Sequence, residues 1–98
     1  MQEIQLLITK ITSSITETKG IEKIILFGSR ARGDADPKSD IDIAIICPNI
    51  TNRDWLDICD RIENIDTLLE INLIRFDSAS KKLQNKILQE GITLYEQH

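Results

Sequence analysis

The strict alternation of polar and apolar residues that begins at Asp40 restricts the fold more than any other feature of this chain. Its two sets are Ile41, Ile43 and Ile45 on one side and Asp40, Asp42 and Ala44 on the other. Successive side chains of a β-strand point to opposite faces, so the pattern predicts a half-buried strand that starts at residue 40. A strand of this kind needs other strands beside it and helices against its apolar face.

Two further segments have the character of strands. Residues 24–27 are a short apolar run of strand-favouring residues that ends at Gly28, which predicts a buried central strand. Residues 70–76 are the third candidate, with Asn72 and Ile74 on one face.

Three segments place apolar residues at helical spacing. The first covers residues 2–18 and ends at Gly20, and the second runs over about residues 53–65. The third begins after Ser80, a plausible N-cap, and ends at Gly91. Helices alternating with strands in 98 residues predict a single domain, residues 1–98, with an α/β or α+β sandwich fold in which helices pack on a small sheet.

The charge balance and the apolar runs restrict the partners. The chain has 12 basic and 16 acidic residues, net charge −4, so the basic field of a nucleic-acid-binding protein is missing and no direct nucleic-acid binding is expected. No apolar run approaches the ~20 residues of a membrane span, and the N-terminus lacks a signal-peptide pattern. We therefore expect a cytoplasmic protein without membrane contact, in which Cys47 and Cys59 are buried free thiols.

Residues 28–33, with the sequence Gly-Ser-Arg-Ala-Arg-Gly, are the first candidate for a binding site. A glycine directly after a buried strand lets the backbone turn, so that its N–H groups and the Ser29 hydroxyl can face an anion such as phosphate. A helical turn here would add its dipole, and Arg30 and Arg32 could neutralise further charge. Gly-Ser is also a common turn pair and loop arginines usually face water, so this stretch alone leaves both interpretations open.

Asp40 and Asp42 are the second candidate. Two carboxylates one residue apart on a strand project from the same face, roughly 7 Å apart along the backbone at ~3.3 Å per residue. Their oxygens suit Mg²⁺, which binds carboxylates and substrate phosphates together. An isolated Asp-x-Asp is more often an acidic, solvent-facing edge. The order of the chain favours a site, because the Gly-Ser turn, a basic loop and the acidic pair fall within 15 residues.

In these residues the sequence resembles the minimal nucleotidyltransferases of the polymerase-beta-like superfamily, whose pattern is a strand, Gly-Ser and then Asp-x-Asp. The likeness extends over nearly the whole chain, including residues 90–95 near its end. It implies an α+β fold with a small mixed sheet flanked by helices, in which Asp40 and Asp42 are catalytic and ligate Mg²⁺. The nucleotide-binding residues expected on this basis are Gly28, Ser29, Arg30, Arg32 and Ser39.

The resemblance also implies a reaction and a partner. Transfer of a nucleoside monophosphate, AMP from ATP in the first instance, to a hydroxyl group would follow. Small domains of this family are often encoded beside a helical HEPN protein, a toxin-like ribonuclease, and act as antitoxins that adenylylate it. We therefore expect a nucleoside triphosphate and a HEPN-domain protein as partners, with a homo- or hetero-oligomer as a further possibility.

One position departs from the family pattern. The pattern has a third acid on the third strand, and the matching catalytic position here is Asn72. An amide can offer its oxygen to a metal but brings no charge and cannot accept the proton of an attacking hydroxyl, which should lower activity by ~10²- to 10⁴-fold. Glu70 and Asp77 are the two acids that could compensate for Asn72. The simpler interpretation is that Glu70 is a solvated strand residue and Asp77 a turn residue. A degenerate transferase that acts by nucleotide or partner binding is therefore the alternative function.

Overall fold

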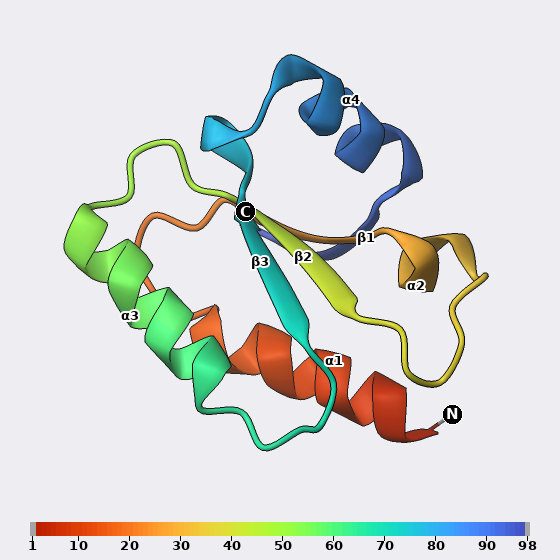
Figure 1. Cartoon of the computed structure of the whole chain (residues 1–98). Coiled ribbons are helices and arrows are strands. Elements are labelled where there is room, and N and C mark those ends of the chain that lie inside the picture. The colour runs from red at the N-terminus through yellow and green to blue at the C-terminus, as the bar shows by residue number, and fades with distance from the viewer. Residues whose placement is uncertain (1, 98) are drawn as a thin grey trace.

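The computed structural model describes residues 2–97, which form a four-stranded mixed sheet with helices on both faces (Figure 1). The strands are β1 (Lys23–Phe27), β2 (Ile41–Ile46), β3 (Ile71–Arg75) and β4 (Ile92–Glu96), in the spatial order β3-β2-β1-β4. The central strand β1 is antiparallel to β2 and to β4, while β2 and β3 are parallel. The α+β fold class expected from the sequence is confirmed.

The helices are α1 (Gln2–Ile15), α2 (Ser29–Arg32), α3 (Asn52–Glu63) and α4 (Lys81–Glu90). Figure 1 shows α1 and α3 together below the sheet and α4 above it. Side-chain caps set two of the starts. The hydroxyl of Thr51 accepts a hydrogen bond from the N–H of Asp54 at 3.1 Å, and the hydroxyl of Ser80 accepts one from Leu83 at 3.2 Å, which confirms Ser80 as an N-cap.

The face of the sheet toward α1 and α3 carries the main core. Ile41, Ile43 and Ile45 are fully buried there, as the alternation from residue 40 predicts. They pack with Ile11 of α1 and Ile58 of α3. This face is closed to solvent along the whole of β2.

Of the described α-helices, α4 packs on the opposite face, and Phe76 after the end of β3 packs beside it. Ile87 of α4 packs on Ile25 of β1 and Ala44 of β2 in a second, smaller cluster. Phe27, which shares this face, is only partly buried. Helix α4 packs on Ala44 in the second half of β2. It does not cover the polar residues at the start of that strand.

Three differences from the sequence-based expectation concern α1, β4 and β2, beside shifts of one or two residues in β1, β3 and α3. Helix α1 ends at Ile15, not at residue 18, and the hydroxyl groups of Thr12, Ser13, Ser14 and Thr16 donate to backbone carbonyls near that end. Such local hydrogen bonds compete with helix continuation. Strand β4 was not predicted at all, because five residues after a helix, exposed or half-buried, give a weak strand pattern. The third difference is smaller: β2 begins at Ile41, one residue after the predicted start.

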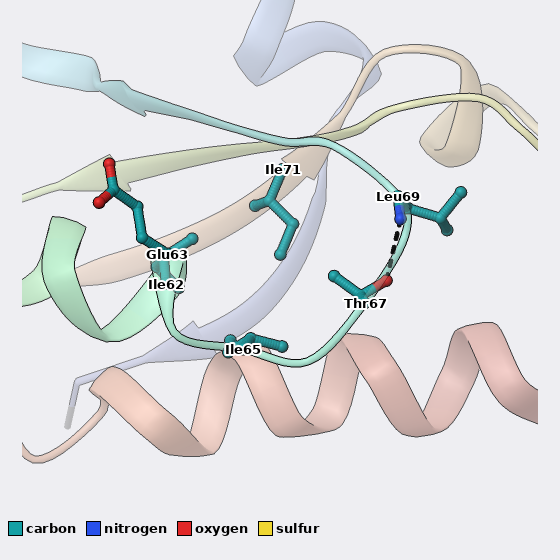
Figure 2. A pocket seen from close by; sticks show the side chains of 6 residues that line it. All are labelled: Ile62, Glu63, Ile65, Thr67, Leu69 and Ile71. Atoms are coloured by element: carbon teal, nitrogen blue, oxygen red, sulfur yellow. Dashed lines mark hydrogen bonds between the residues drawn. The ribbon is translucent and has the colours of Figure 1, made fainter.

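A hollow of about 200 Å³ lies beside the loop between α3 and β3 (Figure 2). Its lining consists of Ile62, Glu63, Ile65, Thr67, Leu69 and Ile71. Because Ile71 faces the main core while Asn72 faces the other side, the hollow and the acidic pair lie on opposite faces of the sheet. Within the described chain no helix is long and apolar enough to cross a membrane.

Candidate functional site

The turn after β1 has the form expected of a close approach between backbone and ligand. Gly28 has φ of +76°, a conformation that favours glycine, and precedes the four-residue helix α2. The carbonyl of Gly28 accepts hydrogen bonds from the N–H groups of Ala31 and Arg32, both at 3.1 Å. The helix ends at Gly33, which is left-handed with φ of +86°. The predicted helical turn within residues 28–33 is therefore present.

Gly28 lies directly against Asp42. Phe27, the residue before it, is paired with Asp42 across the β1–β2 ladder. A methyl group added at Gly28 would overlap the carboxylate of Asp42. Only a glycine leaves room for the acidic side chain at this point, so the turn packs directly on Asp42.

Asp40, Asp42 and Asn72 meet on the α4 face of the sheet, in the part that α4 does not reach. Asp42 and Asn72 are register partners in the parallel β2–β3 pair. The amide nitrogen of Asn72 donates to Oδ1 of Asp42 at 3.0 Å and to Oδ2 of Asp40 at 3.2 Å. Both carboxylates thus converge on one point, which the side-chain amide of Asn72 occupies.

The acidic pair has no cationic partner among the described side chains. Among residues 2–97 neither Asp40 nor Asp42 forms a salt bridge, and the only side-chain donor on both is the neutral amide of Asn72. Two adjacent carboxylates without a counter-charge attract a cation. Two carboxylates and an amide oxygen, presented after rotation of Asn72, are all hard ligands and fit Mg²⁺. No group of three His, Cys, Asp or Glu side chains suited to a metal occurs in the described chain, and at this site the third position is an amide.

The two arginines of α2 make contacts of different kinds. Arg32 pairs with Asp34 at 3.2 Å and with Glu90 at the end of α4 at 3.1 Å. The hydrogen bond to Asp34 raises the pKa of Arg32 most, and the hydrogen bond to Glu90 is the second cause. The guanidinium stays charged. Arg30 turns instead into the loop before β2 and donates to the carbonyl of Ser39. Glu90 was not anticipated from the sequence, because 58 residues separate it from Arg32 and no local pattern connects them.

The remaining candidates lie apart from one another. The hydroxyl of Ser39 accepts from the N–H of Asp36 at 3.0 Å, within the loop. Glu70 is exposed, and its carbonyl accepts from the N–H of Ile41 at 2.9 Å, so its backbone lies next to the start of β2. Asp77 lies away from Asn72, in the turn of residues 76–78 that follows β3, which agrees with the simpler interpretation of it as a turn residue. Its carboxylate accepts from the N–H of Cys47 at 2.8 Å, five residues beyond Asp42, or roughly 16 Å along the strand.

The two cysteines are free thiols. Cys47 is fully buried, as predicted, whereas Cys59 is only half-buried. Burial, assisted by the negative charge of Asp77, raises the pKa of Cys47 to about 11. A thiol in this state is a poor nucleophile and metal ligand at neutral pH, so Cys47 belongs to the core.

The chain is similar to known proteins in sequence and in fold. The family Polymerase beta, Nucleotidyltransferase matches residues 9–98. The protein of Methanocaldococcus jannaschii named "Putative protein adenylyltransferase" is 35% identical over 81 residues, which cover 76% of this chain and 79% of that protein.

Two solved structures are also similar. One is a complex of a tri-AMPylated HEPN toxin from Shewanella oneidensis with its MNT antitoxin, in which the matching chain is 25% identical with a TM-score of 0.69. The match covers 99% of this chain and 74% of that chain. The other is a crystal structure of a toxin-antitoxin with AMP-PNP, at a TM-score of 0.74 and 24% identity, with 93% of this chain and 74% of that chain covered. At that identity the likeness concerns the fold.

Proposed function

Because the chain belongs to the polymerase-beta nucleotidyltransferase family, we propose that it transfers AMP from ATP to a hydroxyl group of a partner protein. The partner in this proposal is a HEPN-domain toxin, which the chain restrains as an antitoxin. Two similarities support the proposal: the relative named for protein adenylyltransferase activity, and the complex in which a HEPN toxin is AMPylated. The membrane-free, cytoplasmic setting expected from the sequence stays a prediction.

The contact between Gly28 and Asp42 is the observation that carries the proposal. The Gly28–Ser29 turn would hold the phosphates through its N–H groups and the Ser29 hydroxyl, and Asp40 and Asp42 would hold Mg²⁺. When bound, the metal supplies charge neutralisation for an in-line displacement at phosphorus. Since the turn touches the carboxylate, phosphates on the turn lie next to that charge.

The proposed reaction needs no protein side chain to accept the proton of the attacking hydroxyl. The hydroxyl oxygen of the acceptor forms a bond to the α-phosphorus of ATP, and the bond from that phosphorus to the oxygen shared with the β-phosphorus breaks. Pyrophosphate leaves, and the hydroxyl proton passes to solvent. The amide of Asn72 cannot take that proton, so we expect a rate ~10²- to 10⁴-fold below that of a family member with an acid there.

The same amide supports a second candidate function. Asn72 donates to both Asp40 and Asp42 and so occupies the point at which their oxygens converge. A chain of this kind could bind its partner, with or without nucleotide, and perform no chemistry. In that case the fold serves as a binding surface and the acidic pair is a relic.

One experiment separates the two candidates. The purified chain is mixed with labelled ATP, Mg²⁺ and the product of the adjacent gene, and label on that protein is measured beside neutralisation of its toxicity. The variants are Asp40→Ala, Asn72→Asp and, as a matched loss of an exposed acid on α3, Asp60→Ala.

If the chain transfers AMP, we expect label on the partner protein with the wild type and with Asp60→Ala. We expect more label with Asn72→Asp and none with Asp40→Ala. Binding without chemistry predicts no label from the wild type and neutralisation that survives Asp40→Ala. An absence of label with both the wild type and Asn72→Asp would overturn the transferase proposal.

A further inference from the structure

The guanidinium of Arg30 is held by the loop between α2 and β2. Its Nε and one terminal nitrogen both donate to the carbonyl oxygen of Ser39, at 3.1 and 2.8 Å. The same terminal nitrogen is 3.3 Å from the carbonyl of Pro37 and 3.4 Å from that of Asp36. Arg30 therefore meets three backbone carbonyls of residues 36–39 and forms no salt bridge with a described carboxylate.

Residues 36–39 form a turn that is closed by its own hydrogen bonds. The N–H of Asp36 donates to the Ser39 hydroxyl, the N–H of Ser39 donates to the carbonyl of Asp36 at 3.1 Å, and the N–H of Lys38 donates to the Asp36 carboxylate at 2.8 Å. These contacts give the loop a defined shape. They do not connect it to the rest of the protein, and the guanidinium of Arg30 makes that connection.

Asp40 depends on this connection more than Asp42 does. Asp42 lies inside β2, paired with strands on both sides, whereas Asp40 precedes the first residue of that strand. The peptide between Ser39 and Asp40 is planar, so a fixed carbonyl at Ser39 also fixes the backbone nitrogen of Asp40. On the other side, the N–H of Ile41 is held by the carbonyl of Glu70.

We propose that Arg30 is a positioning residue, which sets Asp40 beside Asp42 and Asn72 by holding the carbonyl of Ser39. The inference rests on the proposed nucleotidyl transfer and assigns Arg30 to the alignment of the acidic pair, not to the phosphates. The planar fork of an arginine can donate two hydrogen bonds to one oxygen, which a lysine cannot do. Charge alone is therefore insufficient at this position.

The test compares Arg30→Lys and Arg30→Ala with Arg53→Ala, which removes the same charge from an exposed position on α3. Backbone hydrogen exchange is measured over residues 34–41, and kcat and KM for ATP are measured in the transfer reaction. We expect faster exchange over these residues in both Arg30 variants and wild-type exchange in Arg53→Ala. We expect kcat to fall about 10- to 100-fold, the range for residues that orient metal ligands, with KM for ATP changed less than about 3-fold.

Three results would overturn the inference: unchanged exchange over residues 34–41, full activity of Arg30→Lys, or a raised KM for ATP with kcat retained. The last would make Arg30 a phosphate ligand. If Arg30→Ala does not fold, Arg30→Lys decides. If the wild type transfers no AMP, the proposed function fails, and the exchange measurement still decides whether Arg30 holds the loop.

Discussion

Helices α1 and α3 cover one face of the sheet so completely that Ile41, Ile43 and Ile45 have no solvent exposure, whereas α4 packs on only part of the other face. On the α4 face, Asp42 is half-buried and Asp40 is exposed, although both alternate with those isoleucines in the chain. The closed face therefore supplies stability, and the open face supplies room for a ligand. The free energy of unfolding of variants on the two faces tests that division.

The largest effect is expected from Ile43→Ala on the closed face. Ile43 is fully buried between the sheet and two helices that cannot easily collapse onto a cavity, so we expect a loss of about 4 kcal/mol. Ile87→Ala on the α4 face should cost only about 2 to 3 kcal/mol, because its partly exposed neighbours can move inward. Urea unfolding of both variants measures the difference. Equal losses would contradict the division between the faces.

Gly28→Ala should lower stability by about 2 kcal/mol, because alanine is strained at positive φ and its methyl group would displace the Asp42 carboxylate. Gly33→Ala is the matched control. It has a similar φ but open space around the added methyl group, so only the strain of about 1 kcal/mol applies. If thermal unfolding shows the same loss for both variants, the Asp42 carboxylate is not packed on the turn.

We expect the buried thiol of Cys47 to lower the stability of the protein at alkaline pH. Its raised pKa of about 11 means that the folded chain keeps a proton which an unfolded thiol, with its ordinary pKa of 9.0, has lost. The free energy of unfolding should therefore fall between pH 9 and pH 11, by at most about 1.4 kcal/mol per pH unit from this thiol. Urea unfolding across that range measures the slope. The slope should be smaller in Cys47→Ala, and an unchanged slope would exclude Cys47 as its source.

Asn72→Asp should have the smallest effect, a loss of about 1 kcal/mol in buffer with EDTA. The change removes both hydrogen bonds from the amide and places a third carboxylate beside Asp40 and Asp42. Mg²⁺ should then stabilise this variant more than the wild type, because a ligand stabilises the state that binds it. Thermal unfolding with and without Mg²⁺ checks this, with Asn85→Asp on the exposed surface of α4 as the control. A loss that Mg²⁺ does not reverse would argue against a metal at this point.

The parts of the fold with strong periodicity were predictable. The alternation from residue 40 identified the buried face of β2 correctly, and the Gly-Ser and Asp-x-Asp pattern identified the family, which is confirmed. Strand β4 was not predictable in this way, because it owes its place to pairing with β1 and not to a pattern of its own. The end of α1 depended on four hydroxyl groups whose local hydrogen bonds carry no periodic signal.

The candidate site also has features that were predictable from the sequence and features that were not. Its composition could be read from the chain, since Gly28, Asp40, Asp42 and Asn72 were all anticipated and lie together, although their roles stay predictions. The direction of an arginine side chain could not be read in this way. Arg30 contacts carbonyl groups, which every residue has, so no residue type marks its partners in the sequence.

The position of β4 has a consequence for synthesis on the ribosome. Strand β1 is central and needs β4 as its second neighbour, but about 70 residues separate the two along the chain. During translation at ~5–20 residues per second, β1 therefore exposes an unpaired edge for several seconds after β2 has formed beside it. Such an edge is a template for pairing with another chain. A nascent polypeptide that has not yet reached residue 96 should therefore be prone to aggregate.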